Sequence, residues 1–384
     1  MTRLALLATV ALAATGAVLA WQLGADEPAA RPELQQALDR LVSGDTRVAP
    51  GVTAVAIGPR GTWAGAAGVA NVDTGEPMPT DARMRLESVS KLWTAVVLLR
   101  LAEQRRLRLD DTVDLHYPGL VPAGDRITLR QLLNHTSGLV DDNDLAADSD
   151  WYLGQVRDPA LRAELRRAGE KLSADPEWHV PARLVIRWAA ALPLRSEPGT
   201  VYHYSNIGYQ IAGLVAERVS GKPFATLVEE EIVRPLGLES AAYDPRPEIA
   251  GPHPRAYALA PDGTLTDTTR RVEDLAANGG VVAHARDEAR FLTGLMGGEL
   301  LKPQSLAALK ARSGSSGYGL GTGIALTPCG TGHTHNGGGS GFTTSVYVSG
   351  DGARAAVVLL NARTPDGSGD TAAQQTALEL FCAA

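Results

Sequence analysis

The chain has 384 residues, of which 44% are hydrophobic, and a formal net charge of −7. A mildly acidic chain with no basic run argues against nucleic-acid binding. The length allows one large domain or two lobes, and two cysteines far apart in the sequence do not suit a structural zinc site.

The first thirty residues have the pattern of a targeting segment. Arg3 precedes an uncharged apolar run, Leu4–Ala20, and Val18–Ala20 offers a small-residue cleavage site. We therefore expect 1–30 to be a signal peptide and 31–384 to be a secreted or extracytoplasmic protein. The alternative is an uncleaved membrane anchor, because about 17 apolar residues is near the lower limit of spanning length. In an exported protein the pair Cys329 and Cys382 most simply predicts one disulfide.

Segments near both ends of the mature chain have clear periodicity. They predict a helix at 32–42, strands at 52–57 and 62–67, a hairpin of strands at 341–348 and 353–361, and a closing helix at 371–381. Between them, from Ser88 to about Gly294, the pattern is mostly helical. Residues 141–177 are charged and poorly periodic, which fits either a lid or a long surface excursion.

These elements predict an α+β fold in which an antiparallel sheet is built from both chain ends, is flanked by the terminal helices and holds an inserted, mainly helical lobe. The α/β lobe would comprise about 31–87 and 316–384, and the helical lobe about 88–315. A cleft at the junction of the lobes is the natural place for a functional site.

The pair Ser88 and Lys91 is the strongest candidate for reactive groups. Apolar residues at helical spacing follow Ser88, which places it at or just inside a helix N-terminus, one turn from Lys91. An amine beside a hydroxyl can take its proton, and the first N–H groups of a helix favour a developing oxyanion. The motif Ser-x-x-Lys alone is weak, since one is expected by chance in a chain of this length.

Composition strengthens this hypothesis. The chain has 5 lysines against 31 arginines, yet it keeps a lysine at position 91. A lysine can lose its proton when it is desolvated, whereas a guanidinium effectively cannot. The alternative is a solvated helix lysine that happens to follow a serine.

Two more short motifs are candidates for the same site. Tyr204-Ser205-Asn206 lies in a turn before a helix predicted near 210–220, and His335-Asn336-Gly337 leads into a glycine-rich strand edge that a ligand's backbone could approach. The alternatives are an ordinary core tyrosine and a helix cap for the first motif, and metal ligands at His333 and His335 for the second.

In this order, S-x-x-K, Y-x-N and H-x-G resemble the three signatures of the serine β-lactamase and penicillin-binding protein superfamily. The resemblance covers about residues 33 to 382 and is greatest for secreted D-alanyl-D-alanine carboxypeptidases and class C β-lactamases. Three connecting stretches agree with it: Ile127–Leu139, Pro235–Leu238 and Tyr318–Gly321. The two cysteines are also placed as in the secreted carboxypeptidases. The fold implied is the β-lactamase/DD-peptidase fold.

The resemblance implies roles for the motif residues. Ser88 would be the acylated nucleophile, Lys91 would take or share its proton, and Tyr204 would be the partner base and then the acid for the leaving group. These three residues would perform acyl transfer without a cofactor.

Further roles are implied for the residues around this centre. Asn206 would hydrogen-bond Lys91 or the substrate amide, and His335 would help to hold Tyr204 and the substrate's polar end. The oxyanion hole would consist of the Ser88 N–H and a strand N–H near Gly338, beside Gly337.

The substrate is less well defined, because this chain departs from the carboxypeptidases it resembles. Those enzymes carry an arginine shortly before the H-x-G strand, whereas Thr322–Pro328 contains no cation, and Gly338 stands where many relatives have a hydroxyl residue. A carboxylate contact is hard to replace, although Arg157 or Arg162 could substitute.

We therefore consider three functions. The first is a carboxypeptidase or related peptidase acting on D-amino-acid peptides and acylated by penicillin. The second is an esterase or a class C-like β-lactamase with the same nucleophile, and the third is a non-catalytic penicillin-binding or sensing protein. The expected partner is a small peptide, ester or β-lactam substrate, with no nucleic acid and with membrane contact only through an uncleaved leader.

Overall fold

The computed structural model describes residues 31–44, 47–141, 153–174, 180–246, 249–270, 276–314, 316–339 and 341–384. Residues 1–30, which hold the predicted signal peptide, lie outside these ranges, so their cleavage stays a prediction. Residues Arg31–Ala384 form a single compact unit.

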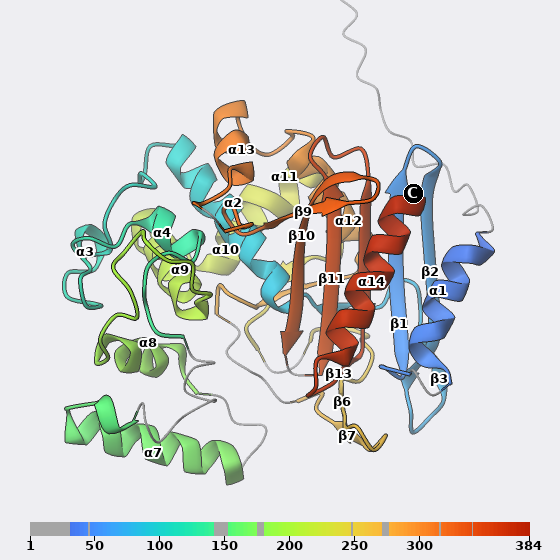
Figure 1. The fold of residues 1–384 in the computed structure, drawn as a ribbon, viewed down its shortest axis with the longest axis horizontal. Coiled ribbons are helices and arrows are strands. Elements are labelled where there is room, and N and C mark those ends of the chain that lie inside the picture. Colours follow the sequence, from blue (N-terminus) through green and yellow to red (C-terminus); the bar gives the residue numbers. More distant parts are fainter. Residues whose placement is uncertain are drawn as a thin grey trace, which may run out of the picture. The chain divides into compact units, whose positions relative to one another are not determined.

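The largest sheet among the described residues has seven strands, all paired antiparallel (Figure 1). In spatial order they are β3 (Glu76–Pro77), β2 (Gly61–Asn71), β1 (Gly51–Gly58), β12 (Ala355–Leu360), β11 (Phe342–Ser349), β10 (Gly330–Gly339) and β9 (Gly323–Thr327). Strands β1 and β12 pair at its centre, with Val55 opposite Val357. The predicted sheet built from both chain ends is therefore confirmed.

Both faces of this sheet are covered. Along β1, Val52, Ala54 and Ala56 belong to the apolar cluster under the terminal helices α1 (Pro32–Val42) and α14 (Ser368–Ala383). The alternate residue Val55 belongs to the larger cluster on the opposite face. Because successive side chains of a strand point to opposite faces, an apolar run without polar alternation is what a doubly covered strand requires.

The terminal helices lie across one face of the sheet, as predicted (Figure 1). Helix α1 buries Leu34, Leu38 and Leu41, the apolar stripe of its sequence. A disulfide between Cys329 and Cys382 joins the turn between β9 and β10 to helix α14. The predicted disulfide is thus confirmed, and it ties the start of β10 to helix α14.

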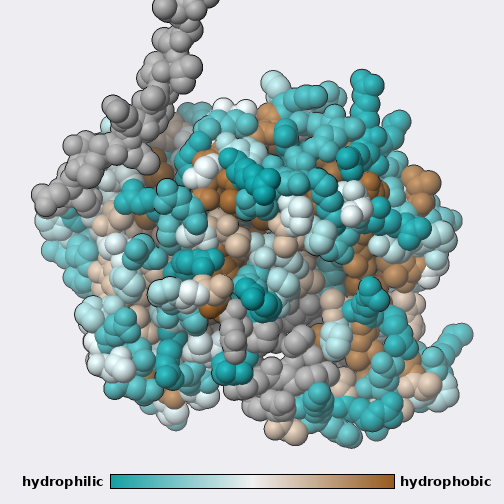
Figure 2. Space-filling view, turned by 180° about the vertical axis from the view of Figure 1, so that it is seen from behind, coloured by the Kyte–Doolittle hydropathy of each residue, from teal (hydrophilic) through white to brown (hydrophobic). Residues whose placement is uncertain are grey.

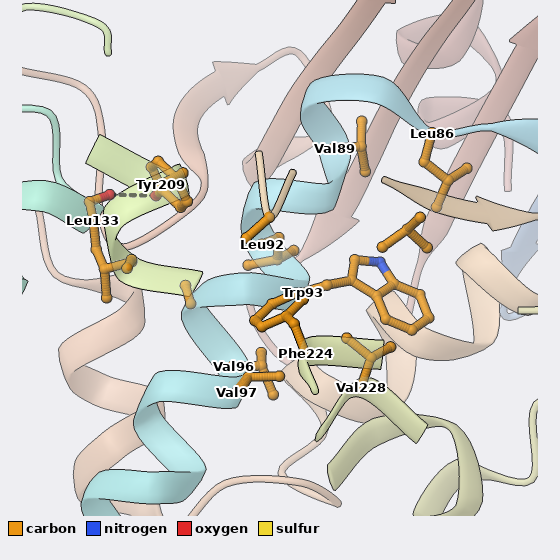
Figure 3. Close-up of a cluster of buried hydrophobic side chains, with 14 of the residues drawn as sticks. Leu86, Val89, Leu92, Trp93, Val96, Val97, Leu133, Tyr209, Phe224 and Val228 are labelled. Carbon is orange, nitrogen blue, oxygen red and sulfur yellow. Dashed lines mark hydrogen bonds between the residues drawn. The ribbon is translucent and has the colours of Figure 1, made fainter. Parts of the chain in front are cut away.

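Helix α2 (Ser90–Glu103) runs through the interior and is buried on nearly all sides, with 11 of its 14 residues buried. Trp93 stacks on Phe291 of α12 (Ala285–Met296), with ring centres 4.1 Å apart, and its indole N–H donates to Glu288 at 3.0 Å. Figure 3 shows that Trp93 lies among the buried apolar side chains on and around this helix. An all-round apolar helix is a core helix, so the start of α2 is held rigidly.

The remaining described elements lie mostly between residues 84 and 310. The helices are η1 (Glu87–Val89), α3 (Val113–His116), α4 (Leu129–Leu133), α7 (Pro159–Ala174), α8 (Ala182–Ala190), α9 (Asn206–Ser220), α10 (Phe224–Val228), η2 (Glu229–Val233), α11 (Arg234–Leu236) and α13 (Pro303–Lys310). Two small sheets interrupt the helical region. Their strands are β4 (Met84–Arg85), β8 (Val281–Ala283) and β5 (Ala242–Tyr243) in one, and β13 (Ala362–Arg363), β6 (Tyr257–Leu259) and β7 (Leu265–Asp267) in the other.

The face of the molecule turned away from the viewer in Figure 1 is mostly hydrophilic, with apolar residues scattered among the polar ones (Figure 2). Scattered exposed apolar residues are usual on protein surfaces. Among the described residues, no helix has the length and apolar character needed to cross a bilayer. The uncleaved-anchor alternative concerns residues 1–30, which lie outside that description.

Candidate active site

Ser88 and Lys91 meet at the start of helix α2. Ser88 lies in the short 3-10 helix η1, which runs directly into α2. The Lys91 amine donates to the Ser88 hydroxyl at 3.0 Å and to the backbone carbonyl of Asn278 at 3.0 Å. Lys91 is fully buried, whereas Ser88 is partly exposed. An amine withdrawn from water therefore touches a hydroxyl that remains partly exposed.

The turn that carries Ser88 is held in an unusual backbone conformation. Glu87 has φ +50°, a region that non-glycine residues adopt at a cost of about 1–3 kcal/mol. Hydrogen bonds to the neighbouring strand β8 fix this turn: Leu86 N–H donates to the Val281 carbonyl at 2.9 Å, and the Ser90 hydroxyl accepts from Val281 N–H at 3.0 Å. A residue kept in a sparsely populated conformation by its surroundings is typical of functional sites.

Tyr204 reaches the same place from a distant part of the chain. The Lys91 nitrogen lies 4.9 Å from the centre of the Tyr204 ring. Helix α9 begins immediately afterwards at Asn206, four residues earlier than predicted, because Ser205 caps it by accepting from Gly208 N–H at 3.2 Å. The helix-cap alternative for Asn206 is therefore wrong, since Ser205 is the cap.

Asn206 is anchored by an acidic residue that the sequence did not single out. Its backbone N–H and its side-chain amide donate to the two carboxylate oxygens of Asp141, at 2.5 and 3.4 Å. Asp141 is buried. The carboxylate thus fixes the first turn of α9 and the orientation of the Asn206 side chain.

His335 lies on β10 and is paired with Tyr318. Its Nε2 atom is 2.9 Å from the Tyr318 hydroxyl, and its Nδ1 atom is 2.7 Å from the Asn336 carbonyl. A carbonyl only accepts, so Nδ1 carries the proton and Nε2 accepts from the phenol. Burial, reinforced by the charge of Lys91, lowers the pKa of His335 to about 3. The ring is therefore neutral at physiological pH.

A cavity of about 290 Å³ adjoins this cluster. It is lined by Tyr204, Tyr318, Gly323, Thr334, His335 and Asn336. Two of these residues, Tyr204 and His335, also interact with Lys91, one by its ring and the other by charge. The cavity is large enough for a small acyl donor.

The glycines of the third motif permit close approach to other groups. A side chain at Gly337 would begin 3.0 Å from the Ser88 nitrogen, and one at Gly338 would overlap the guanidinium of Arg363. That guanidinium pairs with Asp370 at the start of α14. The strand therefore packs against the backbone of Ser88 on one side and against a cation on the other.

Sequence reasoning missed four contributors to this site: Asp141, Tyr318, Arg363 and the Asn278 carbonyl. The stretch Tyr318–Gly321 was recognised only as part of the resemblance. The suggested replacement cation Arg162 instead donates to the nearby Val156 carbonyl. No group of three or more histidines, cysteines or acidic residues that could hold a metal occurs among the residues described.

A serine hydroxyl, an amine and a phenol thus lie together beside a seven-stranded antiparallel sheet, and the chain is a serine hydrolase of the β-lactamase and penicillin-binding protein superfamily. The profile of the Beta-lactamase family matches residues 34–381, so the chain belongs to that family. The resemblance seen in the sequence is confirmed.

Curated relatives differ in activity. The D-alanyl-D-alanine-carboxypeptidase/endopeptidase AmpH of Escherichia coli is 28% identical over 172 residues, which cover 44% of this chain and 38% of AmpH. Esterase EstB of Burkholderia gladioli is 29% identical over 183 residues, covering 46% of this chain and 43% of EstB. Penicillin-binding protein 4* of Bacillus subtilis is 25% identical over 295 residues, covering 72% and 60%. The matches span less than two thirds of each relative.

Solved structures agree on the fold. A D-stereospecific amidohydrolase from Streptomyces sp. superposes with a TM-score of 0.74 at 28% identity, covering 92% of this chain and 98% of that one. A D-amino acid amidase from Ochrobactrum anthropi SV3, in complex with L-phenylalanine amide, gives 0.73 at 22% identity, covering 91% and 96%. The β-lactamase/DD-peptidase fold is thereby confirmed.

Proposed function

We propose that this protein forms an acyl-enzyme at Ser88 and cleaves D-amino-acid peptides, as a D-alanyl-D-alanine carboxypeptidase or related D-amino-acid peptidase, and that penicillin acylates the same serine. One observation carries the proposal. The buried Lys91 amine lies 3.0 Å from the Ser88 hydroxyl and 4.9 Å from the Tyr204 ring centre. That arrangement provides a nucleophile, a proton acceptor and a second proton carrier.

Acylation would use the three groups in turn. Once the Lys91 ammonium group has released a proton to solvent, Ser88 Oγ attacks the substrate carbonyl carbon and its own proton moves to the Lys91 amine. Tyr204 gives its phenolic proton to the leaving nitrogen as the C–N bond breaks, and Lys91 restores that proton to the phenolate. Water then attacks the acyl carbon, its proton enters the Lys91–Tyr204 pair, and the pair returns a proton to Ser88 as the C–O bond breaks.

The oxyanion hole in this proposal consists of the Ser88 N–H and the Gly338 N–H. Gly337 makes this possible, because a side chain there would meet the Ser88 nitrogen at 3.0 Å and push the strand away. One such donor typically contributes a factor of about 10²–10³ to the rate. Asn206, oriented by Asp141, is assigned the hydrogen bond to Lys91 or to the substrate amide.

Two observations favour a substrate that contains a D-amino acid and carries a free carboxylate. The Streptomyces amidohydrolase, whose name states D-stereospecificity, is 28% identical and 98% of its chain is covered. In addition, Arg363 supplies a cation beside Gly338, the position that lacks a hydroxyl residue here. A free substrate carboxylate would share that guanidinium with Asp370.

The second candidate function is ester hydrolysis by the same serine, favoured by the 29% identity to EstB. The two are separated by measuring D-alanine release from a D-Ala-D-Ala peptide, ammonia release from D-amino-acid amides, and hydrolysis of nitrophenyl esters and nitrocefin. We expect D-alanine or D-amide turnover, with Arg363→Gln lowering carboxypeptidase activity about tenfold or more and ester turnover much less. Ester turnover without either D-substrate reaction would overturn the D-specificity.

An extracytoplasmic location is part of the proposal. The disulfide Cys329–Cys382 supports it, since disulfides persist in oxidising compartments. The mass of the mature protein tests it: loss of about the first 20–30 residues is expected, and a full-length product confined to the cytoplasm is the contrary result.

A further inference from the structure

His135 lies at the centre of the aromatic groups around the candidate site. It follows helix α4, is fully buried and has φ +60°. Its ring centre lies 4.3 Å from that of Tyr204, and 4.8, 5.2 and 5.7 Å from those of Tyr318, Tyr209 and Tyr202. The Tyr204 ring is the nearest of the four and is tilted only 31° from the histidine plane.

Hydrogen bonds attach the chain on both sides of Tyr204 to this one residue. His203 N–H donates to the His135 carbonyl at 2.7 Å. Ser205 N–H donates to His135 Nδ1 at 3.0 Å. Together with the ring contact, these bonds restrain the backbone before Tyr204, the backbone after it, and its side chain.

The hydrogen-bonding pattern also fixes the state of the ring. Because a backbone N–H only donates, Nδ1 must accept with its lone pair, which places the proton of the neutral ring on Nε2. Nε2 has no hydrogen-bond partner among the described residues. Burial, with the charge of Lys91 adding to it, lowers the pKa of His135 well below its usual value. Within the described part of the chain His135 thus has no group to exchange a proton with, and it stays neutral.

We propose that His135 is a positioning residue that holds the Tyr204 phenol against Lys91, by accepting the Ser205 N–H and by packing its ring on Tyr204. This inference rests on the proposed function, because His135 acts through the phenol of Tyr204. A residue of the connecting stretch Ile127–Leu139 therefore sets the geometry of proton transfer. Misplacement of a reacting group by about 1 Å can cost up to about 10²-fold in rate.

Two substitutions separate the parts of this role. His135→Phe keeps a ring but removes the acceptor for Ser205 N–H. His135→Asn keeps an acceptor near the position of Nδ1 and tolerates the positive φ, but it removes the ring. We expect the acylation rate with fluorescent penicillin to fall about 30- to 100-fold in His135→Phe and about tenfold in His135→Asn.

A double-mutant cycle with Tyr204→Phe distinguishes positioning from general structural damage. Tyr204→Phe keeps the ring that His135 contacts and removes the phenolic oxygen. If His135 acts through that oxygen, either His135 substitution lowers the single-turnover acylation rate by less than about twofold in the Tyr204→Phe background. Melting temperatures identify any variant that does not fold, and the His135→Asn cycle alone suffices if His135→Phe fails.

Each outcome has a defined meaning. Equal losses in the two backgrounds would assign His135 a purely structural role and overturn the inference while leaving the proposed function intact. Wild-type rates in both His135 variants would also overturn the inference and leave the proposed function intact. A wild-type rate in Tyr204→Phe itself would overturn the proposed role of Tyr204, and the positioning role of His135 with it.

Discussion

Replacing Lys91 by arginine separates its capacity to accept a proton from its positive charge. The lysine nitrogen touches both the Ser88 hydroxyl and the Asn278 carbonyl at 3.0 Å, and the side chain has no exposed surface. Arginine keeps the charge and can still donate to both groups. It cannot take the Ser88 proton, because a guanidinium does not deprotonate in proteins.

The size of the effect follows from these contacts. Loss of general base assistance costs about 10²–10⁴ in rate, which corresponds to about 2.7–5.5 kcal/mol of activation free energy. The larger guanidinium must also fit where Lys91 is fully enclosed, and overpacking costs about 1–3 kcal/mol of stability. We therefore expect kcat/KM to fall at least about 100-fold, with a lowered melting temperature.

The assay is the second-order rate of acylation by a fluorescent penicillin, with kcat/KM for a D-amino-acid substrate beside it. Lys91→Met, neutral and similar in length, should lose about as much activity as Lys91→Arg, whereas Lys302→Arg at an exposed site should lose none. A Lys91→Arg enzyme that keeps a near wild-type rate while Lys91→Met is inactive would refute proton transfer and leave Lys91 with an electrostatic role.

Three further predictions concern stability and ionisation. Cys382→Ser opens a loop of 53 residues, so the free energy of unfolding should fall by about 4 kcal/mol and the melting temperature by about 5 °C. Turnover should be retained. A melting curve of the wild type that does not change on reduction would contradict this prediction. Burial raises the pKa of Glu288 to about 8, so the stabilising effect of this residue is full below about pH 4.5 and is lost as pH rises to 8. Glu288→Gln can still accept the hydrogen bond from Trp93 and should flatten the decline in melting temperature between pH 5 and 8. Parallel curves for the variant and the wild type would contradict this prediction. Because the pKa of His335 is lowered to about 3, the stabilising effect of this residue is full above about pH 6.5 and is lost as pH falls toward 3. At pH 5, nitrogen NMR of the ring should show a neutral imidazole with the proton on Nδ1, and an imidazolium cation at that pH would contradict the prediction.

The elements with strong local patterns were predictable. Helix α1 begins and ends at the predicted residues because its leucine stripe and Pro32 mark it without help from tertiary contacts. The hairpin of β11 and β12 follows from the turn residues Ser349–Gly352 between two apolar runs. By contrast, strands β4, β5 and β8 have only two or three residues each, too few for any alternation to be visible.

The site was predictable to the extent that its residues lie in short motifs. The spacing of Ser88 and Lys91 follows from one helical turn, but the 3-10 geometry at Ser88 depends on β8, about 190 residues away in the chain. The contacts of Asp141 with Asn206 and of Arg363 with Gly338 join segments far apart in the chain. No local sequence pattern predicts that these segments meet. Only tertiary structure brings such groups together.

The most direct test of the central claim is peptide mapping by mass spectrometry after exposure to benzylpenicillin, in the wild type and in Ser88→Ala. We predict one covalent penicilloyl group on the peptide that contains Ser88, and none in the variant, because Ser88 carries the partly exposed hydroxyl that the Lys91 amine contacts at 3.0 Å. Equal labelling of both proteins, or labelling of a different serine, would show that Ser88 is not the nucleophile.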